Sequence, residues 1–118
     1  MVATNQLISN VVTAISSGAC DTPTHIGIGT DSTPPDESDT ALGNELQRNA
    51  IETTTTTDTT IIFTTLINSA EQVGQTLKEF GLFDASTSGD MFQRTTHTTI
   101  SKTGRVEVEY EITIRVTN

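Results

Sequence analysis

Residues 105–116 read RVEVEYEITIRV, and this stretch carries the most regular pattern in the chain. Its apolar residues alternate strictly with charged residues and threonine over the whole stretch. A period of two is typical of a β-strand with one face buried and the other in water. The water-facing side carries Glu107, Glu109 and Glu111, whose charges discourage edge-to-edge association. At roughly 3.3 Å per residue the strand would be about 40 Å long, so we expect either a bend or an extension across a partner subunit.

Earlier segments predict further strands of an antiparallel sheet. They are residues 25–30 (HIGIGT), 61–67 (IIFTTLI), 77–83 (LKEFGLF, with a short helix as the alternative) and 91–100 (MFQRTTHTTI). Gly27 and Gly29 alternate with apolar residues, and they leave room for another backbone to approach. Residues 101–104 (SKTG) predict a four-residue hairpin loop before the final strand.

The segments between these strands are less regular. Residues 30–40 (TDSTPPDESDT) predict an exposed acidic loop, because the proline pair and the aspartates oppose regular structure. Residues 39–52 are ambiguous and include a possible helical turn with Leu42 and Leu46 on one side. The threonine-rich residues 53–60 favour a strand over a solvated linker, because crowded β-branched side chains oppose a helix. A turn pivoting on Gly74 is expected within residues 68–76.

An amphipathic helix is predicted for residues 4–18, with Thr4 or Asn5 as the N-cap and Gly18 at the end. Its apolar side chains recur at the helical spacing and share one face: Leu7, Ile8, Val11, Val12 and Ile15. Because that face is narrow, we expect it to lie on a sheet or on a neighbouring subunit. These five residues are therefore the candidate oligomer interface.

Length and composition limit the architecture. The chain has 118 residues, enough for one domain, and we expect a helix at 4–18 and a β-domain at 24–118. Hydrophobic residues make up 33% and aromatic residues 4%, so the core is lean, while the 25 threonines favour strands. The predicted fold class is mainly β: an antiparallel β-sandwich or jelly-roll-like domain with an N-terminal amphipathic helix.

The charge balance limits the classes of partner that the chain can bind. Fifteen Asp and Glu face six Lys and Arg, for a net charge of −9. Such a surface repels nucleic acid and anionic membranes, so we expect neither as a partner. The sequence holds no apolar run long enough to span a membrane, and we expect no secretory signal. The acidic, lysine-poor composition favours a protein from a very salty cytoplasm, with an acidic mesophilic protein as the alternative.

The sequence offers little to a catalytic, metal or cofactor site. Cys20 and His25 lie near each other in the sequence and could act as a thiol and a base, but spacing alone is weak evidence for catalysis. A free cysteine is usually a small buried hydrophobe. His25 and His97 lack metal-binding spacing, and residues 31–39 lack the pattern of a calcium loop. Residues 25–30 lack the third glycine of a nucleotide-binding loop. We therefore expect a protein without catalytic residues, metal or cofactor.

One charged pair stands out as structural. Glu79 and Arg94 lie in two apolar strand segments on either side of a short turn, so an antiparallel pairing would bring them together. Between them, Gly81 permits tight packing beside Leu82 and Phe83, which we expect to form the structural centre.

Three ordered motifs then resemble a known family. HIGIGT (25–30), DTALGNELQR (39–48) and KEFGLFDASTSGDMFQRT (78–95) together resemble small virion structural domains of tailed bacteriophages and tailed archaeal viruses. The matching residues are Gly29, Thr30, Asp39, Thr40, Leu42, Glu45, Arg48, Glu79, Gly81, Leu82, Phe83, Asp84, Gly89 and Arg94. The resemblance covers about residues 24–118, and it departs at Phe80, where the family commonly has a small aliphatic residue.

The resemblance implies a non-enzymatic building block of a virus particle. It would sit on the capsid surface as a decoration or turret piece, or on the tail as a fibre or baseplate component. Its partners would be itself, as a homo-oligomer, and other virion proteins. The alternative is a host-receptor or glycan-binding adhesin, which usually presents exposed aromatic residues. With four Phe, one Tyr and no Trp, the sequence favours the building block.

Overall fold

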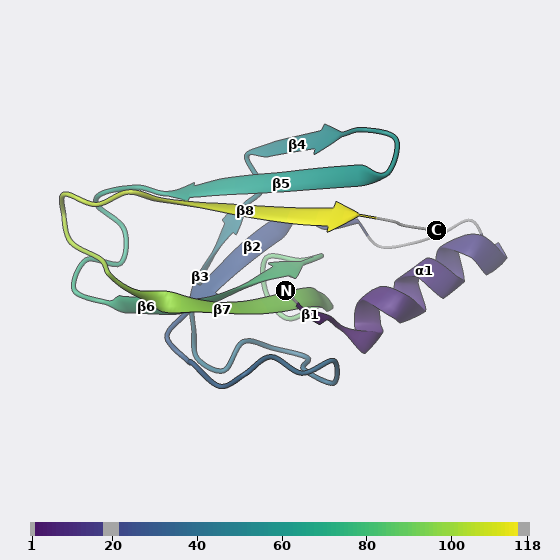
Figure 1. Ribbon diagram of the computed structural model, residues 1–118, viewed down its shortest axis with the longest axis horizontal. Helices are drawn as coiled ribbons and strands as arrows, with labels where there is room; N and C mark the ends of the chain where they lie inside the picture. The colour runs from purple at the N-terminus through teal and green to yellow at the C-terminus, as the bar shows by residue number, and fades with distance from the viewer. Residues whose placement is uncertain (1, 18–21, 116–118) are drawn as a thin grey trace.

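The computed structural model describes residues 2–17 and 22–115. It is mainly β, with two antiparallel sheets and one N-terminal helix, α1 (Asn5–Ser17) (Figure 1). The five-stranded sheet has the order β1 (Val2–Ala3), β7 (Met91–Ser101), β6 (Thr76–Phe83), β2 (His25–Gly29), β3 (Glu45–Ala50). The three-stranded sheet has the order β4 (Thr53–Thr56), β5 (Thr60–Ile67), β8 (Val108–Arg115).

The core joins the two sheets. Its buried side chains come from β2, β6 and β7 of the larger sheet and from β5 and β8 of the smaller one: Ile26, Ile28, Phe63, Ile67, Leu77, Leu82, Phe92, Val108, Tyr110 and Ile112. A second, small cluster contains Leu42, Phe83 and Met91. Alternation along β6 places Leu82 in the first cluster and Phe83 in the second, so the two clusters lie on opposite faces of the larger sheet.

The final strand keeps the alternation seen in the sequence, but it is shorter and has a different neighbour. Val108, Tyr110 and Ile112 are buried, and β8 spans eight residues rather than twelve. It pairs along its whole length with β5 and not with β7, so the predicted hairpin at 101–104 is wrong. Residues 102–107 instead carry the chain from one sheet to the other, and Val116 lies outside the described residues.

Lys102 links the two connections that run between the sheets. Its side chain is buried, and its ammonium group donates to the carbonyl oxygens of Ser69 and Thr103. Its backbone also pairs with Gly74 and Gln75 in the connection between β5 and β6. The two connections between the sheets therefore hold each other, and the predicted pivot Gly74 has a φ of +89°, the left-handed conformation that favours glycine.

Two further segments differ from expectation. Residues 45–50 form strand β3, not a helical turn, because β2 offers them an edge to pair with. The threonine run is a strand as predicted, but it turns within itself. Thr57 and Thr60 exchange backbone hydrogen bonds, so the run splits into β4 and the start of β5.

Helix α1 begins where the sequence predicted, with Thr4 as its N-cap. The Thr4 hydroxyl accepts from the N–H of Leu7 at 3.3 Å, which fills one of the free donors of the first turn. Gln6 and Asn10 donate to the carboxylate of Asp90 and attach the helix to the start of β7. Figure 1 shows α1 extending beyond the ends of the strands. No helix among the described residues is long and apolar enough to cross a membrane.

Candidate functional site

The predicted pair of Glu79 and Arg94 is confirmed. Arg94 Nε donates to Glu79 Oε1 at 2.9 Å, and the two residues are 2% and 0% exposed. They come from the antiparallel neighbours β6 and β7, in which Arg94 lies opposite Gly81. A buried charge of this kind is stable only when its remaining hydrogen-bonding groups are also satisfied.

Backbone N–H groups of the loop at 30–44 satisfy the rest of the Glu79 carboxylate. Its Oε2 accepts from Asp31 at 3.0 Å and from Asn44 at 2.9 Å. Its Oε1 also accepts from Gly43 at 2.9 Å. One buried side chain therefore holds both ends of the loop against β6.

The remaining donors of Arg94 reach the same loop. Its Nη1 donates to the carbonyl of Thr33 at 2.9 Å and to Asp39 Oδ2 at 3.2 Å, and its Nη2 to Asp31 Oδ2 at 3.3 Å. The loop was predicted to be exposed, but part of it is not. Asp31 and Asp39 are half-buried against Arg94.

Asp31 also receives hydrogen bonds from within the loop. The hydroxyl and the N–H of Thr33 donate to its carboxylate at 3.0 and 3.3 Å. These bonds, together with the positive charge of Arg94, lower the pKa of Asp31 below its usual value. The loop at 30–44, Glu79 and Arg94 together form what we call the loop clamp.

Glycines give the loop clamp its space. A Cβ on Gly29 would lie 2.4 Å from the carbonyl oxygen of Asn44 and 2.5 Å from Glu79 Oε2. A Cβ on Gly81 would lie 2.9 Å from the carbonyl oxygen of Gln93. The close approach of another backbone, predicted for Gly27 and Gly29, is confirmed at Gly29, whereas a Cβ on Gly27 would meet the side chain of Phe83 instead. Side chains at Gly29 and Gly81 would push the loop or the neighbouring strand away.

The GLF segment works differently from the prediction. Phe83 does not pack beside Leu82 but lies on the face of the loop clamp, where the Arg48 guanidinium sits 3.5 Å from its ring centroid. Arg48 Nη1 also donates to the carbonyls of Ala85 and Ser88 and fixes the turn after β6. Four of the matching residues therefore contact loops on one face of the larger sheet or hold them there: Arg48, Phe83, Glu79 and Arg94.

The buried side chains of Glu79 and Arg94 at the centre of the loop clamp bond to groups within the protein. The Arg94 guanidinium occupies the space between its three carboxylates, and no group of His, Cys, Asp or Glu in the described part of the chain is arranged to hold a metal. His25 forms a hydrogen bond with the Thr24 hydroxyl at 2.8 Å, and His97 forms one with the Tyr110 hydroxyl. The suggested partner of His25, Cys20, lies outside the described residues.

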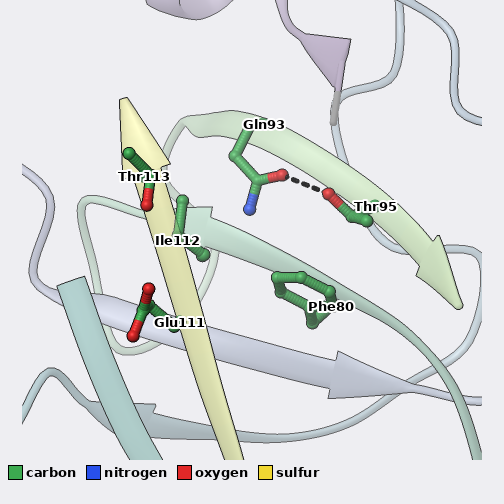
Figure 2. A pocket seen from close by; sticks show the side chains of 6 residues that line it. All are labelled: Phe80, Gln93, Thr95, Glu111, Ile112 and Thr113. Atoms are coloured by element: carbon green, nitrogen blue, oxygen red, sulfur yellow. Dashed lines mark hydrogen bonds between the residues drawn. The ribbon is translucent and has the colours of Figure 1, made fainter. Parts of the chain in front are cut away.

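A groove on the other face of the larger sheet is the more open site. A cavity of about 280 Å³ lies between β7 and β8 and is lined by Phe80, Gln93, Thr95, Glu111, Ile112 and Thr113 (Figure 2). A second cavity of about 490 Å³ shares Phe80 and Glu111 with the first and continues along His97–Ile100 and Val108–Tyr110. We call the two together the interstrand groove.

The interstrand groove contains a residue that sequence reasoning missed. Gln93 is completely buried, and its Oε1 accepts from the Thr95 hydroxyl at 2.8 Å. Its Nε2 has no hydrogen-bond partner, the one such buried side-chain atom among the described residues. The signal in the sequence was the alternation, because Gln93 precedes Arg94 and so had to face the opposite side of the strand.

Aromatic rings line the wider part of the interstrand groove. The centroids of Phe80 and Tyr110 lie 4.8 Å apart, and His97 Nε2 bonds to the Tyr110 hydroxyl at 3.0 Å. Burial raises the pKa of Tyr110 far above its usual value, so the hydroxyl stays neutral. The rings of Phe80 and Tyr110 therefore form an apolar part of the wall, in contrast to the acidic rim formed by Glu109 and Glu111.

The predicted oligomer interface is divided between two environments. Leu7 packs against the main core cluster and is therefore not available to a partner. Ile8, Val11 and Val12 are 53%, 50% and 59% exposed. The side chain of Ile15 lies outside the described residues. Three apolar side chains in a row thus project from α1 into solvent.

Comparison with known proteins adds no relative. No known protein family matches the chain, and no curated protein has significant sequence similarity to it.

Proposed function

We propose that this chain is a non-enzymatic structural protein of a tailed virus of a halophilic archaeon. It assembles as a symmetric homo-oligomer on the capsid surface, as a decoration or turret, or on the tail, as a fibre or baseplate component. The observation that carries this proposal is the exposed apolar stripe of Ile8, Val11 and Val12 on a helix that extends beyond the strands. Apolar surface of this kind marks an interaction site.

Charge favours a second copy of the chain as the occupant of that stripe. The chain carries a net charge of −9, so two copies repel each other over most of their surfaces. Residues 5–17 contain no charged side chain at all. Two helices can therefore meet at this surface without bringing carboxylates together, and burial of the apolar stripe drives the contact.

The loop clamp supports a structural rather than a catalytic role. Four of the residues that carry the resemblance to virion domains lie where loops contact the larger sheet: Glu79 and Arg94 bond to the loop at 30–44, Phe83 packs against Leu42 of that loop, and Gly81 leaves space beside Leu42. We interpret the two sheets as a β-sandwich whose larger sheet is reinforced on its outer face. A rigid module of this kind suits repeated assembly on a particle.

The aromatic residues give less support to the glycan-binding alternative. Phe63, Phe83, Phe92 and Tyr110 are buried, and Phe80 is half-buried within the interstrand groove. None of them forms an exposed platform on which a sugar could stack.

The position of the chain in purified particles tests the proposal. Gold-labelled antibodies against the chain should decorate the capsid or the tail at regular positions. An antibody against a major host protein serves as the control for contamination. Recovery of the chain from host cells alone, with none in the particles, would contradict the proposal.

Salt dependence tests the halophilic origin separately. Molar NaCl screens the repulsion within a compact chain of charge −9, so the Tm should rise steeply between low and molar salt. A flat response in a thermal melt would remove the halophilic part of the proposal and leave the structural role standing.

A further inference from the structure

We propose that the interstrand groove binds an extended segment of another protein, which adds as a strand to the free edge of β8. The segment is uncharged or basic and apolar at alternate positions. This inference goes beyond the assembly through α1, because it concerns a different surface and holds whether or not two helices associate.

The lining of the groove shows that strand edges border it. Glu111, Ile112 and Thr113 follow one another along β8, although their side chains alternate between the two faces. Consecutive residues can line one cavity only where the edge of the strand, rather than one of its faces, borders that cavity. His97–Ile100 of β7 border the wider part in the same way.

Both edges lack a partner strand in the described part of the chain. β8 ends the three-stranded sheet, with β5 on its other side. On the edge of β7 away from β6, β1 pairs with Gln93 and Arg94 and leaves that edge without a partner from Thr95 onward. Unpaired N–H and C=O groups along such edges are a template for an added strand.

Gln93 supplies the second, independent observation. Its buried Nε2 has no acceptor in the described structure, and Figure 2 shows the amide pointing toward Ile112 and Thr113 across the cavity. A buried donor without a partner is costly, and a ligand that supplies an acceptor recovers that cost. A backbone carbonyl of an inserted segment is such an acceptor.

The chemistry of the lining selects a peptide over a sugar. Phe80, Ile112, Val108 and Tyr110 present hydrocarbon and ring surface, and one buried amide donor is free. A sugar would leave the unpaired backbone edge of β8 without a strand, whereas an extended peptide fills the groove with apolar side chains and satisfies its backbone along β8.

Charge decides which chain supplies the peptide. Glu109 and Glu111 border the groove, so an acidic segment would be repelled. The strand of this chain with the best apolar alternation is β8 itself, and it carries the same glutamates. A second copy is therefore disfavoured, and the partner is a different protein with a neutral or basic strand.

The test uses a designed peptide, acetyl-Lys-Val-Thr-Val-Thr-Val-Lys-amide, titrated into the isotope-labelled protein and followed by NMR. We expect shifts at the amides of residues 108–113 and at the side-chain amide of Gln93. An otherwise identical peptide with glutamate at both ends should bind more weakly. A version with N-methyl groups on alternate residues should not bind, because its hydrogen-bonding edge is blocked.

A pair of variants isolates the role of Gln93. Gln93→Met keeps the bulk of the side chain and removes the donor, so the affinity for the peptide should fall about fivefold, the factor for one neutral hydrogen bond. The Tm of the free protein should change little, because the variant removes an unsatisfied buried donor, and the Thr95 hydroxyl, which loses its acceptor, is half-exposed and can bond to water. Gln75→Met, at an exposed glutamine in the connection before β6, should change neither quantity.

Three results would overturn the proposal. They are the absence of binding at millimolar peptide, shifts confined to residues outside the groove, and equal binding by the N-methylated peptide. An unchanged affinity in Gln93→Met would also contradict it, because the unpaired donor would then have no part in recognition.

Discussion

The two faces of the larger sheet differ most clearly at adjacent residues. Arg94 is part of the loop clamp, and its guanidinium donates to carboxylate and carbonyl oxygens around it. Gln93 faces the interstrand groove, where its amide nitrogen has no hydrogen-bond partner. Both side chains are buried in one strand, so burial alone does not distinguish them. The satisfied network holds the molecule together, and the unsatisfied group indicates where a partner binds.

The strongest way to break this contrast is to open the loop clamp. Arg94→Met leaves the Glu79 carboxylate buried without its charged partner, which should cost about 3–5 kcal/mol of unfolding free energy. The double variant Glu79→Gln with Arg94→Met should cost less than the sum of the two single variants, because no lone charge remains. Urea unfolding of the four proteins gives the coupling energy.

A coupling energy near zero in that cycle would contradict a cooperative interaction within the loop clamp. Gln93→Met, which alters the neighbouring residue on the opposite face, serves as the matched control and should change the stability of the free protein little.

The second prediction compares two phenylalanines of β6. Phe83 is completely buried beneath Arg48, so Phe83→Ala should cost about 3 kcal/mol or somewhat more. Phe80 is half-buried along the open groove, and Phe80→Ala should cost about 1–2 kcal/mol. Thermal melts of both variants measure the difference. Equal losses would show that the groove is as tightly closed as the clamp.

A third prediction concerns the space left by glycine. Gly29→Ala places a methyl group against the backbone of Asn44 and the Glu79 carboxylate, and it should cost about 1–3 kcal/mol by overpacking. A Cβ on Gly104 meets nothing within 4 Å, so Gly104→Ala should leave the midpoint of urea unfolding nearly unchanged. A Gly29→Ala protein with the wild-type midpoint would show that the loop at 30–44 is not held tightly.

The fourth and smallest effect is a dependence on pH. The pKa of Asp31 is lowered in the folded protein, so its carboxylate stays ionised there at a pH at which the unfolded chain takes up a proton. Its contribution to stability is therefore present above the ordinary value of 3.8 and is lost as pH falls below that value. Asp31→Asn should flatten the acid limb of a plot of stability against pH.

Asp58→Asn is the control for that measurement, since Asp58 lies in the exposed turn between β4 and β5. A wild-type acid limb in Asp31→Asn would mean that other carboxylates account for the acid sensitivity. Asp36 and Glu71 are the alternatives, because hydrogen bonds lower the pKa of each.

Single strands could be predicted well from the sequence, but the strands with which they pair could not. The alternation of Val108, Tyr110 and Ile112 identified β8 but not its pairing with β5, because a period of two carries no information on the neighbouring strand. The pairing of Glu79 with Arg94 was predictable because a short turn joins their strands.

The other contacts of the loop clamp could not be predicted from the sequence. Asp31 and Asp39 lie more than 50 positions from Arg94, and composition alone made their loop read as solvated. The groove was missed for a related reason. It arises where two strands of different sheets diverge, and no local pattern records that arrangement.

The most direct test of the proposed assembly is the oligomeric state in molar NaCl, measured by sedimentation velocity. We predict an oligomer for the wild-type chain and a monomer for Val12→Asp, which places a charge in the exposed stripe of α1. Thr55→Asp adds the same charge to the exposed strand β4 and should leave the oligomer intact. A monomeric wild-type chain at high concentration, or an oligomer that survives Val12→Asp, would contradict assembly through α1.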